Sequence, residues 1–297
     1  MSTSKYRAFI QVVETGSLTK AAKALGYSQP GISHMMDSLE SDMGFPLLIR
    51  NKDRILPTED GKRVLYYCYQ IIKNENYLRE TVSSIHGVLE GDIRLGAYCS
   101  LMSEFVPRAV QNFTGVYSNI RFYLQEVEHG NFQNLLSQGV LDLAFMNEFV
   151  PKGFHFIPLF HDKSVVIMRQ DHPFVSYETL TPSMLNGCDF IMPMEGYNDV
   201  IAAVQQKSPF SPNIRFYTAS DACAIAMVSE GLGISIVSSL QVKLLPAGLV
   251  VKEFEGNYGR KLGIAIKSLK HMSPAIREFV RIAKNTAMKM GQEHIVT

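Results

Sequence analysis

Residues 17–34 read SLTKAAKALGYSQPGISH, and this stretch decides the fold of the first part of the chain. It predicts two short helices joined by a tight turn at Gly26, because glycine readily adopts the positive φ angle that such a turn needs. The second helix is expected to begin at Ser28, a good N-capping residue, and Pro30 suits its first turn. Two helices joined in this way are typical of a helix-turn-helix, whose second helix enters the DNA major groove.

The flanking residues support the same structure. Apolar residues at helical spacing predict the buried faces of a first helix, ending at Gly16, and of the recognition helix. These residues are Phe9, Val12 and Val13, and Ile32, Met36 and Leu39. Gln29, Ser33 and His34 are then expected to face outward, where glutamine typically pairs with adenine.

Two short strands around a polar turn are predicted at residues 47–50 and 54–56. The basic residues of this region fall within fourteen positions: Arg50, Lys52, Arg54, Lys62 and Arg63. They could form a solvated charged loop. Beside a helix-turn-helix we interpret them as a wing that contacts phosphate.

A long helix is predicted after Thr58, which can cap it. Eight positions in this region alternate four and three apart, a spacing that indicates a coiled coil: Val64, Cys68, Ile71, Glu75, Leu78, Val82, Ile85 and Leu89. The alternative is a helix packed on its own domain. We favour a dimer, because a helix inside one domain rarely keeps a strict 3.5-residue period this long.

Beyond a hinge bracketed by Gly87 and Gly91, short apolar strands alternate with helices as far as residue 290. This alternation predicts α/β layers with parallel sheets. Residues 156–160 and 164–169 are expected to form two separate extended segments.

Composition limits the possible functions. A chain of 297 residues suggests two or more domains, and a net charge of +1 argues against a protein that coats DNA by charge alone. The four cysteines have neither metal nor redox spacing, which favours a reducing cytoplasm, and Cys99 and Cys223 are expected to be buried structural residues. The chain shows no signal peptide or membrane-spanning stretch, and its eight histidines show no metal spacing.

The first 61 residues resemble the N-terminal domain of LysR-type transcriptional regulators. The residues that carry the match are Phe9, Gly16-Ser17-Leu18-Thr19, Ala21-Ala22, Leu25, Ser28-Gln29-Pro30, Ile32-Ser33, Leu39-Glu40, Gly44, Leu47, Arg50, Thr58 and Gly61. A weaker resemblance covers nearly the whole remainder. It rests on Ile93-Arg94-Leu95-Gly96 with Pro107, on the segment from Gly139 to Phe145, and on Gly231-Leu232-Gly233-Ile234.

The resemblance implies a winged helix-turn-helix at residues 1–58, all α apart from its wing, and a long linker helix at 59–89. It implies an effector domain at 90–297 with two α/β lobes, like a periplasmic binding protein. Lobe 1 would comprise about 91–162 and 266–297, and lobe 2 about 163–265. Linker helices pair antiparallel in this family, which usually forms a tetramer as a dimer of dimers.

The expected site residues fall into two sets. The DNA-binding set is Thr19, Lys20, Ser28, Gln29, Pro30, Ser33, His34, Arg50, Arg54 and Thr58, with Arg50 at the minor groove and Thr58 at phosphate, as the resemblance implies. The effector-binding set is Tyr98, Cys99, Ser100, Leu101, Met102, Asn147, Glu148, Glu195, Tyr197 and Ser220. Ser100 falls at the start of a helix, where free N–H groups suit an acid, although it could simply cap that helix.

We therefore expect a sequence-specific DNA-binding transcription regulator that is switched by a small molecule bound between two lobes. An α/β enzyme with an accessory DNA-binding domain is the alternative, but the sequence contains no Gly-rich phosphate loop, nucleophile elbow or metal motif. A solute-binding protein would need export. The expected partners are double-stranded DNA, an organic acid effector rather than a base, further copies of this chain and RNA polymerase. No catalytic residue, metal, cofactor or membrane partner is expected.

Overall fold

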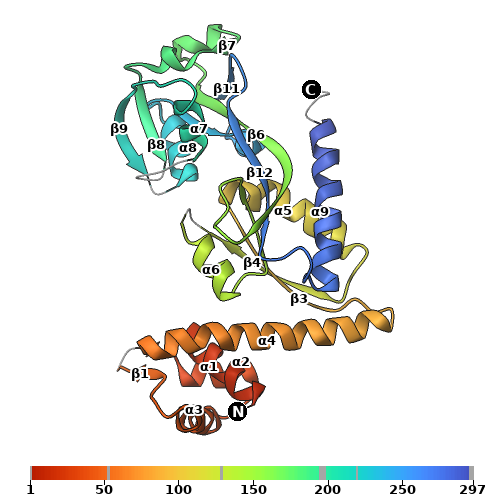
Figure 1. The fold of residues 1–297 in the computed structure, drawn as a ribbon. Helices are drawn as coiled ribbons and strands as arrows, with labels where there is room; N and C mark the ends of the chain where they lie inside the picture. The colour runs from red at the N-terminus through yellow and green to blue at the C-terminus, as the bar shows by residue number, and fades with distance from the viewer. Residues whose placement is uncertain (1, 52–53, 128–129, 194–198, 219, 294–297) are drawn as a thin grey trace.

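The chain forms three parts stacked on one another, as Figure 1 shows: a small helical domain, one long helix, and a two-lobed α/β domain. The structure is a computed structural model that describes residues 2–51, 54–127, 130–193, 199–218 and 220–293. The long helix lies between the other two parts and contacts both.

The N-terminal domain has the predicted helices and wing. Its elements are α1 (Thr3–Thr15), α2 (Leu18–Leu25), α3 (Gln29–Met43), β1 (Leu48–Arg50) and β2 (Ile55–Pro57). The Ser28 hydroxyl accepts a hydrogen bond from the N–H of Gly31 at 3.2 Å, and Gly26 has a φ of +73°, so the cap and the turn are as predicted. The predicted apolar faces of α1 and α3 form the core, where Phe9, Ile32 and Leu39 are fully buried.

The wing is an antiparallel pair in which Arg50 lies opposite Ile55. The Glu40 carboxylate fixes this strand pair to α3, because it accepts hydrogen bonds from the backbone N–H groups of Leu47 and Leu48 at 2.6 and 3.0 Å. The end of α1 holds the second strand, since the carbonyl of Gly16 accepts from the N–H of Ile55.

The linker helix α4 (Glu59–Ile85) begins at Thr58, whose hydroxyl accepts from the N–H of Gly61 at 2.8 Å. Its 27 residues span about 40 Å. The eight positions predicted to form a coiled-coil seam, from Val64 to Leu89, lie in different environments. Cys68 is buried in the N-terminal core, the positions from Ile71 to Ile85 are largely exposed, and Leu89 lies beyond the helix against lobe 1. The seam is therefore shorter than predicted.

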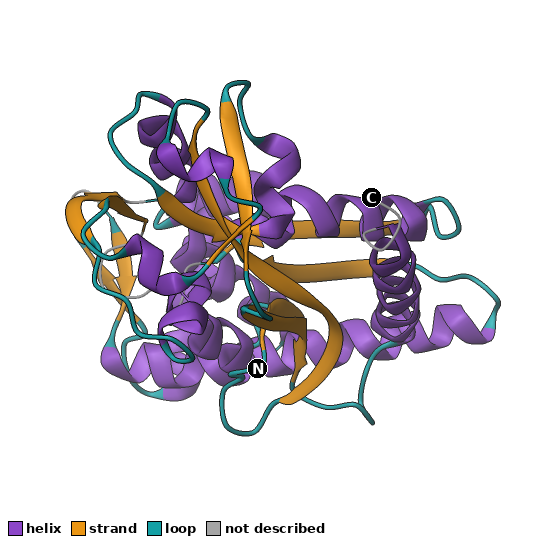
Figure 2. Ribbon diagram, turned by 90° about the horizontal axis from the view of Figure 1, so that it is seen from above, coloured by secondary structure: helices purple, strands orange, loops and turns teal. Residues whose placement is uncertain are grey.

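Lobe 1 is a sheet flanked by helices. Figure 2 shows the whole chain from above, with helices, strands and loops in different colours. Lobe 1 consists of β3 (Gly91–Ala97), α5 (Cys99–Thr114), β4 (Ile120–Glu126), α6 (Phe132–Gln138), β5 (Leu143–Asn147), β12 (Gly259–Ile266), α9 (Pro274–Glu293) and the first part of β6 (His155–Arg169). Its core is formed by buried side chains of residues 93–157 and 262–290. Leu240, from the part of the chain that forms lobe 2, also belongs to this core.

Lobe 2 is built on the second part of β6. Its elements are β7 (Thr179–Leu180), β8 (Asp189–Pro193), α7 (Asp199–Gln205), β9 (Asn213–Thr218), α8 (Asp221–Ser229), β10 (Ser235–Ser238), β11 (Leu249–Phe254) and short 3₁₀ helices at Pro173–Ser176, Pro182–Leu185 and Ser239–Leu244. Two apolar clusters fill it, one around Phe190 and one around Ile191, whose side chains point to opposite sides of β8.

Two predictions about the sheets were wrong. The sheets are mixed, because β12 runs antiparallel to β5 and β6, while β3 is parallel to β4 and β5. Residues 155–169 form one continuous strand that passes from lobe 1 into lobe 2 (Figure 1). The strand continues because Asp162 is buried in an ion pair with Arg260 on the neighbouring strand β12.

Candidate DNA interface and effector site

The exposed face of α3 carries the residues expected to read DNA. Gln29, Pro30 and His34 are exposed, and Ser33 is half-buried beside them. The hydroxyl of Ser28 is committed to the helix cap. This face presents amide, imidazole and hydroxyl groups from one side of a capped helix, which is the chemistry that reads base edges in the major groove.

Thr19 and Lys20 are exposed in the first turn of α2, which Ser17 caps by accepting from the N–H of Lys20. Thr58 uses its hydroxyl within the protein: besides capping α4, the hydroxyl donates to the carbonyl of Pro46 at 2.9 Å. Any contact of Thr58 with phosphate must therefore share a hydroxyl that already has two partners.

The wing arginine is paired with an acid that the sequence reasoning left out of the DNA-binding set. Nη2 of Arg50 lies 2.6 Å from Oδ1 of Asp37, which is on α3 one turn beyond Ser33. Arg54 is exposed, and its side chain runs beside Gly16, where a Cβ atom would come within 2.8 Å of its Cγ. The spacing of Asp37 from Ser33 was a readable signal, because residues four apart share a helix face.

The predicted effector residues at the start of α5 lie in differing environments. Cys99 is exposed, Met102 is half-buried, and Tyr98 and Ser100 are buried, while Leu101 is fully buried in the lobe 1 core. Ser100 does not act as the side-chain cap of α5. Its hydroxyl accepts a hydrogen bond from Nη2 of Arg260 at 3.1 Å.

Arg260 is the centre of a buried polar network between the lobes, and sequence reasoning missed it. Its Nε lies 3.0 Å from Oδ2 of Asp162, and its guanidinium lies 5.3 Å from the ring centre of Tyr98. Asp162 also accepts hydrogen bonds from the hydroxyls of Ser238 and Ser239. The network thus joins α5, β6, β12 and the end of β10. The signal in the sequence was weak, because β6 and β12 each carry more than one charged residue and no local pattern marks Asp162 and Arg260 as partners.

Two more predicted residues meet this network at a cavity of about 180 Å³. Asn147 and Glu148 line it together with His161, Lys207 and Arg260. The Asn147 side chain accepts from the N–H of Phe149, and the Glu148 carboxylate accepts from the N–H of Lys261 at 2.9 Å. Desolvation holds the pKa of His161 below its ordinary value. The Asp162 carboxylate opposes this shift, and the Lys207 ammonium group adds to it.

In lobe 2, the Ser220 hydroxyl caps α8 by accepting from the N–H of Cys223 at 3.3 Å. Asp221 follows in the first turn and accepts from the side chain of Gln241. Glu195 and Tyr197 lie outside the described residues, so their predicted roles stay predictions.

The expectation that Cys99 and Cys223 are buried was wrong, since both are exposed at the starts of α5 and α8. Exposure does not make Cys99 reactive. Desolvation of its sulfur and the nearby Glu126 carboxylate raise the pKa of the Cys99 thiol to about 11, so little thiolate forms at neutral pH.

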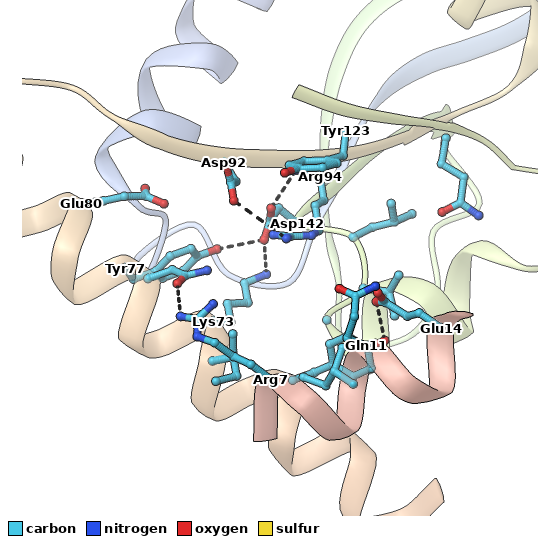
Figure 3. Close-up of a pocket in the computed structure, with 18 of the residues that line it drawn as sticks. Arg7, Gln11, Glu14, Lys73, Tyr77, Glu80, Asp92, Arg94, Tyr123 and Asp142 are labelled. Carbon is cyan, nitrogen blue, oxygen red and sulfur yellow. Dashed lines mark hydrogen bonds and ion pairs between the residues drawn. The ribbon is translucent and has the colours of Figure 1, made fainter. Parts of the chain in front are cut away.

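A larger cavity, of about 600 Å³, lies between the N-terminal domain, α4 and the edge of lobe 1 (Figure 3). Lys73 on α4 forms an ion pair of 2.8 Å with Asp142, which also accepts from the backbone N–H of Arg94 at 2.9 Å. Glu80, one of the lining residues, has only 4% of its surface exposed, and its Oε2 has no hydrogen-bond partner among the described residues. This cavity marks the contact through which the two domains meet.

A winged helix-turn-helix joined by a long helix to two α/β lobes defines a ligand-responsive DNA-binding regulator. Residues 3–62 match the model of the bacterial regulatory helix-turn-helix proteins of the lysR family, and residues 86–287 match the LysR substrate binding domain. The chain belongs to the LysR family of transcriptional regulators. This confirms the resemblance seen in the sequence.

Relatives match along nearly the whole chain. The uncharacterized transcriptional regulator YvbU of Bacillus subtilis is 26% identical over 96% of this chain and 98% of its own. The transcriptional activator CmpR of Synechocystis is 29% identical, over 85% and 84% of the two chains. These relatives are regulators of transcription, so the alternative of an α/β enzyme is set aside.

Solved structures share the fold. Full-length OxyR C199D from Pseudomonas aeruginosa has a TM-score of 0.78 at 21% identity, covering 97% of this chain and 94% of that one. CbnR complexed with its target DNA has a TM-score of 0.70 at 18% identity, covering 96% and 100%. Among the described residues, no helix is both long and apolar enough to cross a membrane, and no group of three or more His, Cys, Asp or Glu side chains could hold a metal.

Proposed function

We propose that this regulator reads its operator with the exposed face of α3 and the wing, and that a small organic acid bound between the lobes changes that binding. The observation that best supports DNA reading is the polar face formed by Gln29, Ser33 and His34, which lies beside the wing residue Arg50. CbnR, a structural neighbour, has been solved on its target DNA, which makes the same use of the N-terminal domain reasonable here.

In vitro selection from random duplexes, followed by anisotropy titration of the selected and a scrambled duplex, tests the DNA-binding half. Gln29→Ala should lose about 1–3 kcal/mol of discrimination if the amide pairs with a base. Lys23→Ala, on α2, is the control because no base contact is expected from it. Equal affinity of wild-type protein for both duplexes would reject sequence-specific reading.

The proposed effector site is the start of α5 with Ser100 and Arg260. Ser100 lies at the N-terminus of the sixteen-residue helix α5, where backbone N–H groups are unpaired and the helix dipole is positive. The guanidinium of Arg260 lies beside the Ser100 hydroxyl. These groups favour a carboxylate. Because Asp162 already neutralises one side of Arg260, a ligand with one acidic group fits the charge balance better than a polyanion.

Mass spectrometry under native conditions can identify small molecules that remain bound after purification, and calorimetry with the identified compound measures its affinity. An acid that binds in the micromolar range and alters the anisotropy titration would support the proposal. Tight binding of an organic base, with no response to acids, would contradict it.

We further propose that α4 pairs with the α4 of a second copy and that two such dimers form a tetramer. Support comes from the exposed apolar side chains of Ile71, Leu78, Val82 and Ile85, of which Ile85 is 77% exposed. Contact with RNA polymerase and a cytoplasmic location are proposed from the regulatory role alone. Sedimentation equilibrium decides between monomer, dimer and tetramer.

A further inference from the structure

The recognition helix carries an acid at a position where it faces DNA in the proposed function. Asp37 follows Ser33 by four residues on α3, so the two share one side of the helix. The Asp37 side chain is 59% exposed and the Arg50 side chain 45% exposed, yet their charged atoms lie 2.6 Å apart. The pair joins the recognition helix to the wing across the surface.

This ion pair is not needed to place the wing. Glu40 already holds the start of β1 against α3 through two backbone N–H groups. An exposed ion pair contributes little to stability because water and salt screen it. The main effect of Asp37 is therefore electrostatic: it neutralises the wing cation that would otherwise attract phosphate of any sequence.

We propose that Asp37 is a specificity-determining residue, which keeps Arg50 from contacting non-matching DNA and releases it when a cytosine amino group in the major groove takes its place. The inference rests on the proposed DNA-binding function. On non-matching DNA, release of Arg50 would leave the Asp37 carboxylate unpaired beside phosphates, so the arginine stays with it. On matching DNA, N4 of cytosine donates to Asp37, since carboxylates accept from this group, and Arg50 becomes free for the DNA backbone.

The chain offers a matched control on the same helix. Asp42 is also on α3 and also forms an ion pair, but with Lys5 of α1 at 2.8 Å, on the side that packs toward α1. Asp37→Asn and Asp42→Asn make the same change of charge at different sides of α3. Thermal melts would check that both variants fold, as expected for exposed positions.

The test uses the full-length protein with the selected duplex and its scrambled counterpart, over a series of salt concentrations. Asp37→Asn should bind the scrambled duplex about tenfold more tightly, with a log–log salt slope steeper by about one unit for the released arginine. The ratio of the two affinities should fall about tenfold. Replacing the selected C·G pairs one at a time should show one position where wild type loses affinity and Asp37→Asn does not.

A double-mutant comparison isolates the pair. In an Arg50→Ala background, Asp37→Asn should no longer tighten binding to the scrambled duplex. An unchanged affinity ratio in Asp37→Asn, or an equal shift in Asp42→Asn, would overturn the inference while leaving the proposed function intact. Wild-type protein that does not distinguish the two duplexes would reject the proposed function, and the role of Asp37 with it.

Discussion

Lys73 of the linker helix and Asp142 of lobe 1 form an ion pair of 2.8 Å whose side chains are 19% and 6% exposed. The pair is the most enclosed of the charged contacts that line the cavity between the domains (Figure 3). Asp142 sits just before β5 and also holds the backbone of Arg94 on β3. Any shift of α4 against lobe 1 must therefore break or move this pair.

Lys73→Ala should weaken the contact between α4 and lobe 1 without affecting the reading of DNA. Removal of one partner leaves the other charge enclosed, which costs about 3 kcal/mol for a buried pair and less where water reaches it. Hydrogen exchange should rise in residues 73–85 and in β3. Lys62→Ala, which breaks an exposed pair with Glu59 on the same helix, is the control and should change little. Equal exchange in the two variants would show that the pair does not hold the domains together.

The contact between α4 and lobe 1 should weaken as pH rises toward neutrality. Burial of Glu80, together with the nearby Asp142 and Asp92 carboxylates, raises its pKa to about 7, although Ser273 and Lys73 act in the opposite direction. A carboxyl whose pKa is raised by folding stabilises the protein fully below its unfolded pKa, and this stabilisation is lost as pH rises through the folded value. The effect should amount to at most about 3 kcal/mol.

Denaturant unfolding between pH 5 and 8 measures this dependence. Glu80→Gln should flatten the decline, because an amide stays neutral at every pH. Glu75→Gln on the same helix is the control: Arg7 and Arg79 lower the pKa of Glu75, so its contribution is constant over this range. A wild-type curve parallel to that of Glu80→Gln would show that Glu80 does not titrate there.

Charge placed on the exposed face of α4 should dissociate dimers. Ile71→Lys with Leu78→Lys would bury two unpaired ammonium groups in the proposed interface, which is unfavourable by several kcal/mol. Sedimentation at low micromolar concentration should then give the monomer mass. Val116→Lys, an exposed apolar position in lobe 1, is the control. A double variant that keeps the wild-type mass would place the dimer interface elsewhere.

Bulk at Ser100 should abolish the response to effector. Ser100→Ala removes the hydroxyl that meets Arg260, a loss of about 0.5–1.5 kcal/mol, whereas Ser100→Phe fills the space at the start of α5. Calorimetry with the identified ligand should rank wild type above Ala, and Phe should show little or no binding. DNA binding without ligand should persist in both. Normal ligand binding by the Phe variant would remove Ser100 from the site.

Local signals were enough to predict the N-terminal domain. Ser28, Gly26 and the apolar face of α3 act within a few residues of one another. The polar network between the lobes was not predictable in this way. Asp162 and Arg260 are 98 positions apart, and neither has a local pattern that names its partner. The break expected inside β6 was wrong for the same reason, because the partners of the buried Asp162 (Arg260, Ser238 and Ser239) all lie far away in the sequence.

Long-range pairing also explains the misjudged sheets. Alternating strands and helices predict parallel neighbours, but β12 returns from lobe 2 in the opposite direction and so enters lobe 1 antiparallel. The misjudged cysteines reflect a local effect of another kind: Cys99 and Cys223 each lie in the first turn of a helix, on its exposed side, while Leu101 in the same turn as Cys99 faces the core.

The core of lobe 1 has a consequence for how the protein is made. It draws side chains from β3 and also from α9, where Phe279 is fully buried and packs against Phe113 and Phe122. When the helix-turn-helix and all of lobe 2 have left the ribosome, α9 has not yet done so, and lobe 1 is still incomplete. The N-terminal domain has a core of its own, formed by side chains between residues 6 and 68, and so it can fold before the core of lobe 1 is complete.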